Sequence, residues 1–154
     1  MGGVYALQRL MKDSPDDRST IRSVLAAYVR THAQDNPSGS DKPSGPVPPG
    51  LDRTRLAVDV EAALTTVAAS PPANGRDPLD LHNVDFHHRH LAYKALTSAN
   101  LDGAALGNTD LRQTNLTTAF LNGGDLHNAD LRGAILDNAA LKGRGPAQLT
   151  AAGG

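Results

Sequence analysis

Histidine is the residue type whose spacing in this 154-residue chain first suggests chemistry. Four histidines fall within nine residues, at His82, His87, His88 and His90, and His127 follows His87 by forty positions. Imidazole ligates transition metals and changes its charge near neutral pH. Metal-binding histidines usually come at fixed short spacings with carboxylate or cysteine partners, whereas this spacing is irregular. The pattern favours an exposed polar surface; a pH-sensitive partner surface and a metal site are the alternatives.

Other catalytic groups find little support in the sequence. The chain has no cysteine, which excludes thiol catalysis, disulfides and cysteine-built zinc sites. Ser98 and the other serines lack a His–Asp companion at a suggestive spacing, and the glycine pair at 123–124 is no phosphate-binding loop. Asp110 and Asp130 are twenty residues apart, which predicts stacking rather than an acid–base pair. We expect no enzyme activity, no catalytic residue, and no bound cofactor or metal.

The composition excludes several classes of binding protein. Lys and Arg number 15 against 16 Asp and Glu, so the net charge of −1 provides no basic footprint for nucleic acid. Three Tyr, two Phe and no Trp are too few for a surface that stacks unpaired bases. The first residues do not form a signal-peptide pattern, and no apolar run approaches the ~20 residues that cross a bilayer. We expect a cytoplasmic protein that binds neither nucleic acid directly nor membranes.

The C-terminal half repeats with a period of five. Large apolar residues recur without a miss at thirteen positions: Leu81, Phe86, Leu91, Leu96, Leu101, Leu106, Leu111, Leu116, Leu121, Leu126, Leu131, Leu136 and Leu141. In a helix, five residues rotate by roughly 500° and would spread these side chains around the axis. In a strand, an odd step sends them to alternate faces. They all stay inward only if the chain turns once per repeat, which predicts stacked coils of four repeats.

Other columns of the repeat support this coil. The residue two before each centre is mostly Ala, Gly, Thr or Val, as a second and tighter inward position requires. Asp or Asn often stands one before the centre, where a short polar side chain can bond neighbouring backbone N–H groups. Gly or Asn often stands two after the centre, and these residues accept unusual turn dihedrals.

Repeats such as 99–103 (ANLDG) and 129–133 (ADLRG) resemble the A-(D/N)-L-x-x unit of the pentapeptide-repeat family. The resemblance implies a mainly β fold, a right-handed quadrilateral β-helix with four repeats per coil and about three coils. The helical pattern of residues 1–69 is similar to the stretch that precedes the repeats in some bacterial members of the family.

The chain divides into five predicted segments. In order, these are a two-helix segment at 1–34, a Pro/Gly/Ser linker at 35–50, a helix packing on or capping the β-helix at 51–70, the β-helix at 77–143 and a flexible tail at 144–154. The helices are expected at about 3–12, 15–33 and 53–69, where apolar residues recur at helical spacing. Five Pro and three Gly in the linker cannot continue a helix.

Some residues depart from the ideal repeat. Arg89 and Lys94 occupy inward positions of the first coil, where a lone charge is costly, so we expect a distorted coil or side chains that reach the rim. Phe120 and Ile135 replace the polar residue before the centre and expose apolar surface. Pro146 stands where the fourteenth centre would fall, so the coil ends with unpaired backbone edges. This end is suited to capping or to a homodimer through the C-terminal coil.

A coil filled by its own leucines has no interior pocket, so we expect a non-enzymatic interaction or scaffold module with a protein partner. The candidate partner surface comprises His82, His87, His88, His90, Tyr93, Phe120 and His127. The family resemblance suggests an alternative, protection of a type II topoisomerase (DNA gyrase) by mimicry of duplex DNA. Residues 77–143 carry eight Asp against five Lys and Arg, which is mildly acidic, but the coil is short. A remoter alternative is small-molecule binding or catalysis at the His-rich first coil.

Overall fold

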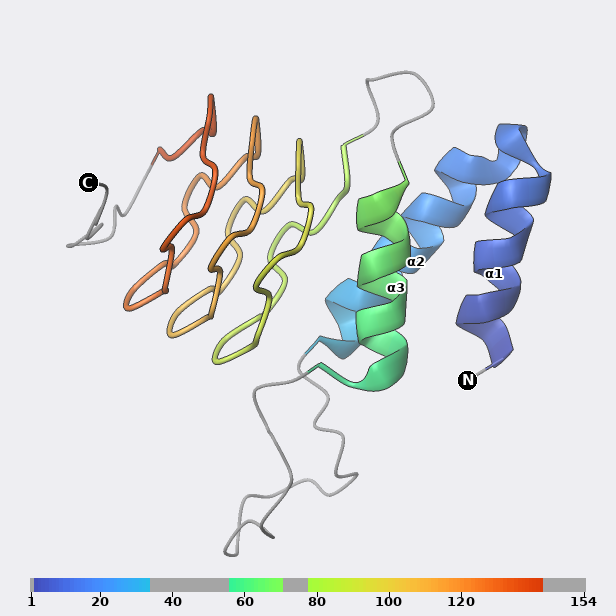
Figure 1. The fold of residues 1–154 in the computed structure, drawn as a ribbon, viewed down its shortest axis with the longest axis horizontal. Helices are drawn as coiled ribbons and strands as arrows, with labels where there is room; N and C mark the ends of the chain where they lie inside the picture. The colour runs from blue at the N-terminus through green and yellow to red at the C-terminus, as the bar shows by residue number, and fades with distance from the viewer. Residues whose placement is uncertain (1, 34–55, 71–77, 143–154) are drawn as a thin grey trace, which may run out of the picture.

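The computed structural model describes residues 2–33, 56–70 and 78–142. Three helices, α1 (Gly2–Asp13), α2 (Arg18–His32) and α3 (Val58–Ala69), precede the coil of repeats. The helices stand at one end of the coil, with α2 and α3 near it and α1 farther away (Figure 1). None of the described helices is both long enough and apolar enough to cross a membrane. The predicted linker at 35–50 and the predicted tail at 144–154 lie outside the described residues.

Helices α2 and α3 pack against each other through apolar stripes, and α1 contacts both. The buried apolar residues are Ile21, Leu25, Ala26 and Val29 in α2, and Val60, Ala63, Leu64 and Val67 in α3. Their spacing of three or four residues places each set on one side of its helix. These residues belong to the same hydrophobic core as the leucines of the coil. The helices and the coil therefore share one core.

Two helices begin later than the sequence predicts. The helix expected from residue 15 opens with a 3₁₀ turn, Pro15–Asp17, in which the Asp17 N–H bonds the Ser14 carbonyl at 3.3 Å. Helix α3, expected from residue 53, begins at Val58 because Ala57 has an extended backbone (φ −55°, ψ 145°). Both differences lie at element boundaries, where sequence patterns are least informative.

Polar contacts tie α2 to both ends of α3. The buried Arg22 guanidinium donates to the backbone carbonyls of Val67, at 3.3 Å, and of Ser70. It thereby adds a side-chain donor at the C-terminal end of α3, where the Val67 carbonyl also accepts the Ser70 N–H at 3.2 Å. At the other end, the Tyr28 hydroxyl donates to Asp59 at 2.5 Å. These bonds fix the relative position of the two helices.

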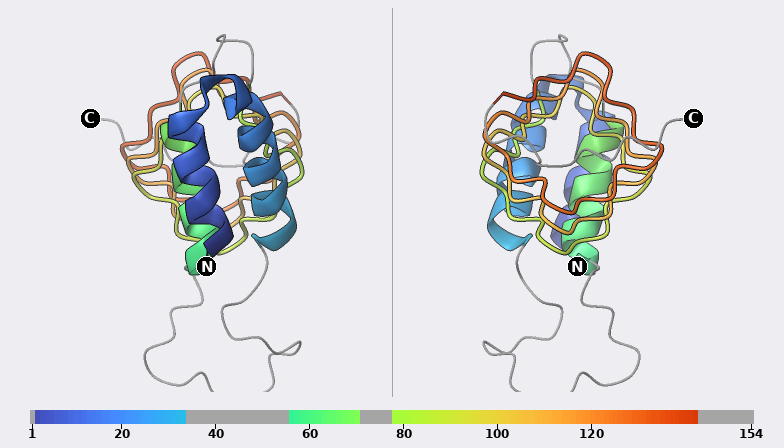
Figure 2. Two further views of the ribbon diagram at one scale, coloured as in Figure 1. Left: turned by 90° about the vertical axis from the view of Figure 1, so that its right-hand side faces the viewer. Right: turned by 90° about the vertical axis from the view of Figure 1, so that its left-hand side faces the viewer.

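The repeats form a coil whose successive turns lie twenty residues apart. Nine parallel β-bridges join residues twenty positions apart, from Asp80↔Asn100 to Phe120↔Ala140. The backbone N–H of a repeat centre donates to the backbone carbonyl nineteen residues later, as the Leu81 N–H does to the Asn100 carbonyl at 2.8 Å. Four repeats of five residues therefore make one turn. Seen end-on, the successive coils superimpose (Figure 2).

The predicted mainly β fold appears as isolated bridges rather than extended strands. Within the described repeats, each five-residue unit contributes one bridge residue and a two-residue turn. The unit is too short for a longer strand, because the chain changes direction once in every repeat. Stacking of the bridges from coil to coil replaces the continuous ladder of an ordinary sheet.

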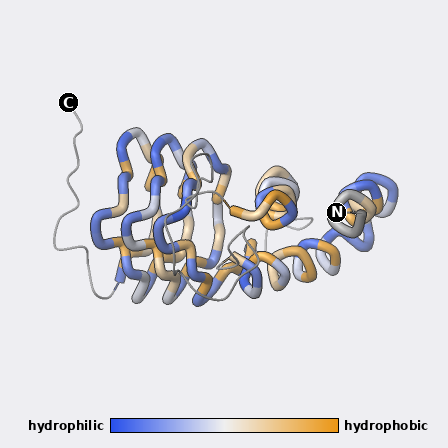
Figure 3. Tube along the Cα trace, turned by 90° about the horizontal axis from the view of Figure 1, so that it is seen from below, coloured by the Kyte–Doolittle hydropathy of each residue, from blue (hydrophilic) through white to orange (hydrophobic). Residues whose placement is uncertain are grey.

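The repeat centres fill the interior of the coil. The ten centres from Leu81 to Leu126 are all buried, with at most 5% of their surface exposed. Leu131 and Leu136 are partly exposed, and Leu141 is 40% exposed. Hydrophilic residues follow the outer corners of the coil (Figure 3). Burial of the centres thus declines only at the C-terminal end.

The corners use left-handed backbone at the second residue after each centre. All twelve described residues at this position have φ between 53° and 70°: Asn83, His88, Tyr93, Ser98, Gly103, Asn108, Gln113, Thr118, Gly123, Asn128, Gly133 and Asn138. Glycine and asparagine accept this conformation readily, as the sequence predicts. A tyrosine or threonine does not, so the stacked coils must impose the turn on those side chains.

Candidate interaction surface

Short polar side chains, one residue before the repeat centres, form hydrogen bonds to the backbone at the corners of the coil. The residue one before the centre accepts a hydrogen bond from the backbone N–H two residues later, as Asp80, Asp85, Asn100, Asp110, Asn115, Asp125 and Asp130 all do. This is the local bonding that the Asp and Asn column predicts. The carboxylates are thus fixed in position relative to the outward residue that follows them.

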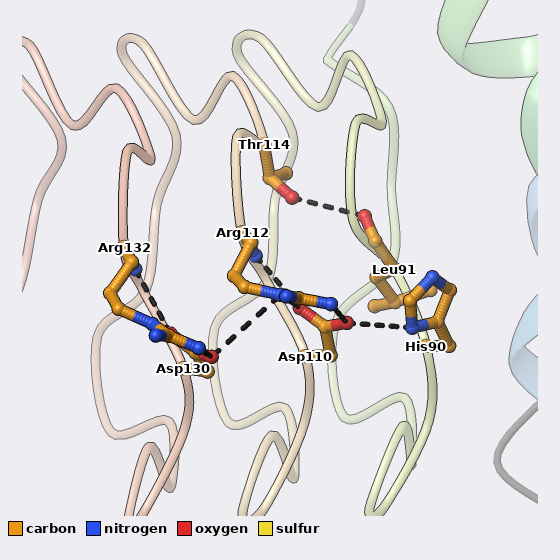
Figure 4. Close-up of polar contacts among 7 residues, drawn as sticks. All are labelled: His90, Leu91, Asp110, Arg112, Thr114, Asp130 and Arg132. Carbon is orange, nitrogen blue, oxygen red and sulfur yellow. Dashed lines mark hydrogen bonds and ion pairs between the residues drawn. The ribbon is translucent and has the colours of Figure 1, made fainter.

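One face of the coil carries a chain of ion pairs, here called the ion-pair ladder: His90, Asp110, Arg112, Asp130 and Arg132 (Figure 4). Asp110 lies 2.7 Å from His90 Nδ1 and 2.9 Å from Arg112 Nε. Asp130 lies 3.7 Å from Arg112 Nε and 2.6 Å from an Arg132 amino group. Each carboxylate therefore lies between two basic side chains from different repeats.

The ladder keeps its acidic residues charged. The hydrogen bond from the Arg112 side chain lowers the pKa of Asp110; the Arg112 backbone N–H adds to this effect, while partial burial opposes it. The side chain of Arg132 lowers the pKa of Asp130 in the same way. Both carboxylates are therefore ionised at neutral pH. The ladder is a row of fixed, mutually compensated charges.

The sequence predictions included His90 and the stacking of Asp110 on Asp130, but not the two arginines. The signal was present, because the triplet Asp-Leu-Arg occurs at 110–112 and again at 130–132, one coil later. A twenty-residue offset places the two triplets side by side. A comparison of outward-facing residues twenty positions apart in the sequence would have identified Arg112 and Arg132.

Buried hydroxyl groups support the coil beneath this face. Thr109 donates to the Phe86 carbonyl at 2.7 Å. Thr114 donates to the Leu91 carbonyl at 3.0 Å, as Figure 4 shows. Each threonine thus bonds a backbone group of the preceding coil. Among the described residues, no buried side-chain nitrogen or oxygen lacks a hydrogen-bond partner.

The predicted histidines separate into three places. His82 Nδ1 lies 2.7 Å from Asp80 and 2.8 Å from Arg30, while His90 belongs to the ladder. His87, His88 and His127 gather on another face: the ring centres of His87 and His127 are 5.2 Å apart, and those of His87 and His88 are 4.8 Å apart. His87 and His127 therefore share an outward column, as their forty-residue spacing predicts. Within the described residues, no group of three or more His, Asp or Glu could hold a metal ion.

Large apolar side chains also lie exposed on the coil. Tyr93 is 77% exposed, Phe120 is 43% exposed and Ile135 is 46% exposed. Tyr93 and Phe120 stand in other columns of the twenty-residue register than His87, His88 and His127. Their role as partner contacts stays a prediction.

Of the two basic residues of the first coil, Lys94 reaches the helices and Arg89 is buried. The Lys94 ammonium bonds Glu61 of α3 at 3.2 Å and the Thr65 hydroxyl at 3.1 Å. Arg89, at the preceding repeat, is buried with 8% of its surface exposed. The Lys94 side chain thus extends out of the coil interior, as predicted, and its ammonium group lies at the surface of α3.

A second contact joins the helices to the coil. Arg30 of α2 forms an ion pair with Asp80 at 2.8 Å. Beside it lies a pocket of about 320 Å³, between α2 and the start of the coil, lined by Arg22, Ser23, Ala26, Arg30, Pro78, Leu79, Asp80 and Asn100. Another pocket of about 310 Å³ lies between α1 and α3.

Residues 80–117 and 114–143 match the family model "Pentapeptide repeats", with eight copies. The pentapeptide repeat protein Rfr23 from the cyanobacterium Cyanothece 51142 is 32% identical over 40% of this chain and 43% of its own, with a TM-score of 0.40. HetL, a pentapeptide repeat protein involved in heterocyst differentiation regulation in Nostoc sp. strain PCC 7120, is 33% identical over 40% of this chain and 29% of its own, with a TM-score of 0.37.

A further pentapeptide repeat protein, alr5209 from Nostoc PCC 7120, is 42% identical over 42% of this chain and 57% of its own, with a TM-score of 0.23. This chain thus spans 29% to 57% of the length of these three proteins. No curated protein matches it. The family match agrees with the twenty-residue register of the bridges, and together they identify residues 80–143 as a segment of pentapeptide repeats that follows a helical segment.

Proposed function

We propose that this chain is a non-enzymatic protein–protein interaction or scaffold module. The observation that carries the proposal is that Tyr93, Phe120 and Ile135 stay exposed on a scaffold whose centres are buried. Aromatic side chains on a rigid surface are typical anchors of protein interfaces, because they bury much area at little cost in conformational entropy. The right-handed quadrilateral architecture with about three coils forms part of the same proposal, and the twenty-residue register supports it.

A comparative pull-down from the native host tests this function. The full chain, a Tyr93→Ser/Phe120→Ser double variant and a matched Gln113→Ala variant serve as baits. We expect a partner that the full chain and Gln113→Ala recover reproducibly and that the double variant loses. Equal recovery by all three baits, or no reproducible partner, contradicts the proposal.

We also propose that a second copy of the chain docks on the C-terminal coil. The support is the partly exposed Leu131 and Leu136 and the 40% exposed Leu141 at the end of the core. A second coil stacked there would bury these side chains and pair the backbone edge. We expect light scattering of the full chain to show a concentration-dependent dimer that Leu141→Glu weakens. A monomer at all concentrations contradicts the dimer and leaves the first proposal standing.

The ion-pair ladder weighs against the alternative of DNA mimicry at a type II topoisomerase. A mimic of duplex DNA needs uncompensated negative charge, whereas Asp110 and Asp130 each lie beside arginine. A gyrase supercoiling assay with and without the protein tests this alternative. We expect no change in supercoiling or in its drug sensitivity, and a protective effect would favour mimicry.

A further inference from the structure

Two imidazole rings from coils that are two turns apart lean toward each other over a glycine. His87 and His127 have ring centres 5.2 Å apart and ring planes inclined by 48°. Between them in the same column stands Gly107, the one glycine among the thirteen residues that directly follow the repeat centres. The rings thus converge across the middle coil instead of spreading into solvent.

Gly107 is required here for space. A Cβ atom built on Gly107 would lie 2.2 Å from Cε1 of His127 and 2.3 Å from Cε1 of His87, both far inside van der Waals contact. Any other residue would push the two rings apart. The absence of a side chain at 107 is therefore what lets two histidines forty residues apart meet.

The His127 ring is held in one orientation and one tautomer. Its Nδ1 atom lies 2.8 Å from both oxygens of Asp125, and a carboxylate can only accept a hydrogen bond, so Nδ1 carries the proton. Its Nε2 atom keeps a lone pair, which lies 3.1 Å from the side-chain amide nitrogen of Asn108.

A carboxylate that accepts a hydrogen bond from one imidazole nitrogen, and so leaves the lone pair on the other, is the arrangement that orients histidine ligands in metal sites. We propose that His87 and His127 form a two-histidine site for one divalent transition-metal ion of the Cu²⁺, Ni²⁺ or Zn²⁺ class. Asp125 is the positioning residue behind His127, and Gly107 provides the space between the ligands. The metal replaces the hydrogen bond that Asn108 makes to His127.

The ring separation suits a shared ion. A metal about 2.05 Å from each ligating nitrogen, at a tetrahedral angle, places two imidazole centres roughly 5 Å apart. The observed 5.2 Å agrees with this value. Since no third His, Asp or Glu of the described residues completes a metal group, two protein ligands leave the remaining coordination positions to water or to a ligand from a partner. The site is therefore an open one of modest affinity.

Calorimetric titration of the tag-free full chain with NiCl₂ and CuCl₂ near neutral pH tests the site. We expect saturable binding of one ion with a micromolar dissociation constant. His87→Ala, His127→Ala and Gly107→Ala should each weaken it at least tenfold, because each removes a ligand or separates the two rings. Asp125→Asn should weaken it by about tenfold, as loss of an outer carboxylate does.

His90→Ala is the matched control, because His90 lies in the ion-pair ladder away from this pair. It should bind metal as the unaltered chain does. Unchanged binding in His87→Ala or His127→Ala, equal weakening in His90→Ala, or no saturable binding at millimolar metal would overturn the proposal. Thermal melts of every variant separate loss of the site from loss of the fold.

A measurement on the unaltered chain avoids any question of folding. Electron paramagnetic resonance of the one-to-one Cu²⁺ complex should show hyperfine coupling from two imidazole nitrogens. Coupling from one imidazole, or from backbone amide nitrogens, would mean that the histidines do not share the ion.

Discussion

Leu96, Leu116 and Leu136 form one column of the coil, yet the first two are fully buried and the third is partly exposed. The first coil meets α2 and α3, whose apolar residues join its core, whereas no described segment lies beyond the last coil (Figure 1). In a repeat array, the stability of each unit depends on its neighbours. The covered end and the open end should therefore respond differently to the same change.

The sharpest test of this difference is one substitution made at both ends. Leu96→Ala removes a fully buried side chain beneath the helices and should cost about 2–5 kcal/mol of unfolding free energy. Leu136→Ala, in the same column at the open end, should cost less than about 2 kcal/mol, because part of this side chain already meets water. Urea unfolding followed by circular dichroism measures both. Equal costs would mean that the last coil is covered in solution.

The contact between Lys94 and Glu61 should matter less than the core. Lys94→Met keeps the aliphatic stem but removes the charge that pairs with α3, and we expect a loss of about 0.5–1 kcal/mol, typical of a half-exposed ion pair. Lys142→Met, at the exposed open end, should change stability by less than about 0.5 kcal/mol. A double-mutant cycle with Glu61→Gln isolates the pair. A coupling energy near zero would show that the contact does not hold the helices.

Acid should weaken the ion-pair ladder, which runs from coil to coil toward the open end. The pKa values of Asp110 and Asp130 are lower in the folded chain than in the unfolded one. These two carboxylates therefore stabilise the fold fully at a pH above their pKa in the unfolded chain, which is about 3.9. This stabilisation is lost as the pH falls below that value toward their lower pKa values in the folded chain. Urea midpoints measured near pH 7, 5 and 3 should fall less in Asp110→Asn than in the parent chain. Asn115→Ala, at the same repeat position without a charge, should keep the parental dependence; an equally steep loss in Asp110→Asn would contradict this role.

The smallest effect concerns the left-handed corner at Tyr93, in the covered coil. Tyr93 has φ 64° and is 77% exposed, whereas the open coil has Gly133 in the same column. Tyr93→Asn should raise stability by ~0.5 kcal/mol, because asparagine adopts this conformation with less strain and little packing is lost. A thermal melt detects the change. A lower melting temperature would show that the tyrosine ring contributes packing that outweighs its strain.

The coil could be predicted from the sequence because its information is local and repeated. Leucine at every fifth position fits neither a helix nor a strand, and each further repeat tests the same hypothesis again. The family match at 80–143 confirms the resemblance seen in units such as 99–103. The convergence of His87 and His127 was also predictable, since the twenty-residue register fixes which outward residues share a column.

The attachment of the helices to the coil was not predictable to the same degree. That Lys94 pairs with Glu61, and that Arg30 pairs with Asp80, depends on how α2 and α3 dock, and no short-range pattern encodes this. The start of α3 at Val58 likewise follows the extended backbone of Ala57, which the apolar spacing of the helix does not encode. Sequence periodicity therefore predicts the five-residue repeat well, but it does not predict how the helices pack on the coil.

The twenty-residue register has a consequence for how such a chain can change in length. Gain or loss of four whole repeats lengthens or shortens the coil by one turn and leaves every later residue on its original face. Gain or loss of a single repeat rotates everything that follows by a quarter turn, although each repeat would still fold. Such a change between 88 and 126 would carry His127 off the face of His87, and one between 113 and 126 would also separate Arg112 from Asp130. The outer surface therefore tolerates growth in steps of twenty residues, while the core tolerates steps of five.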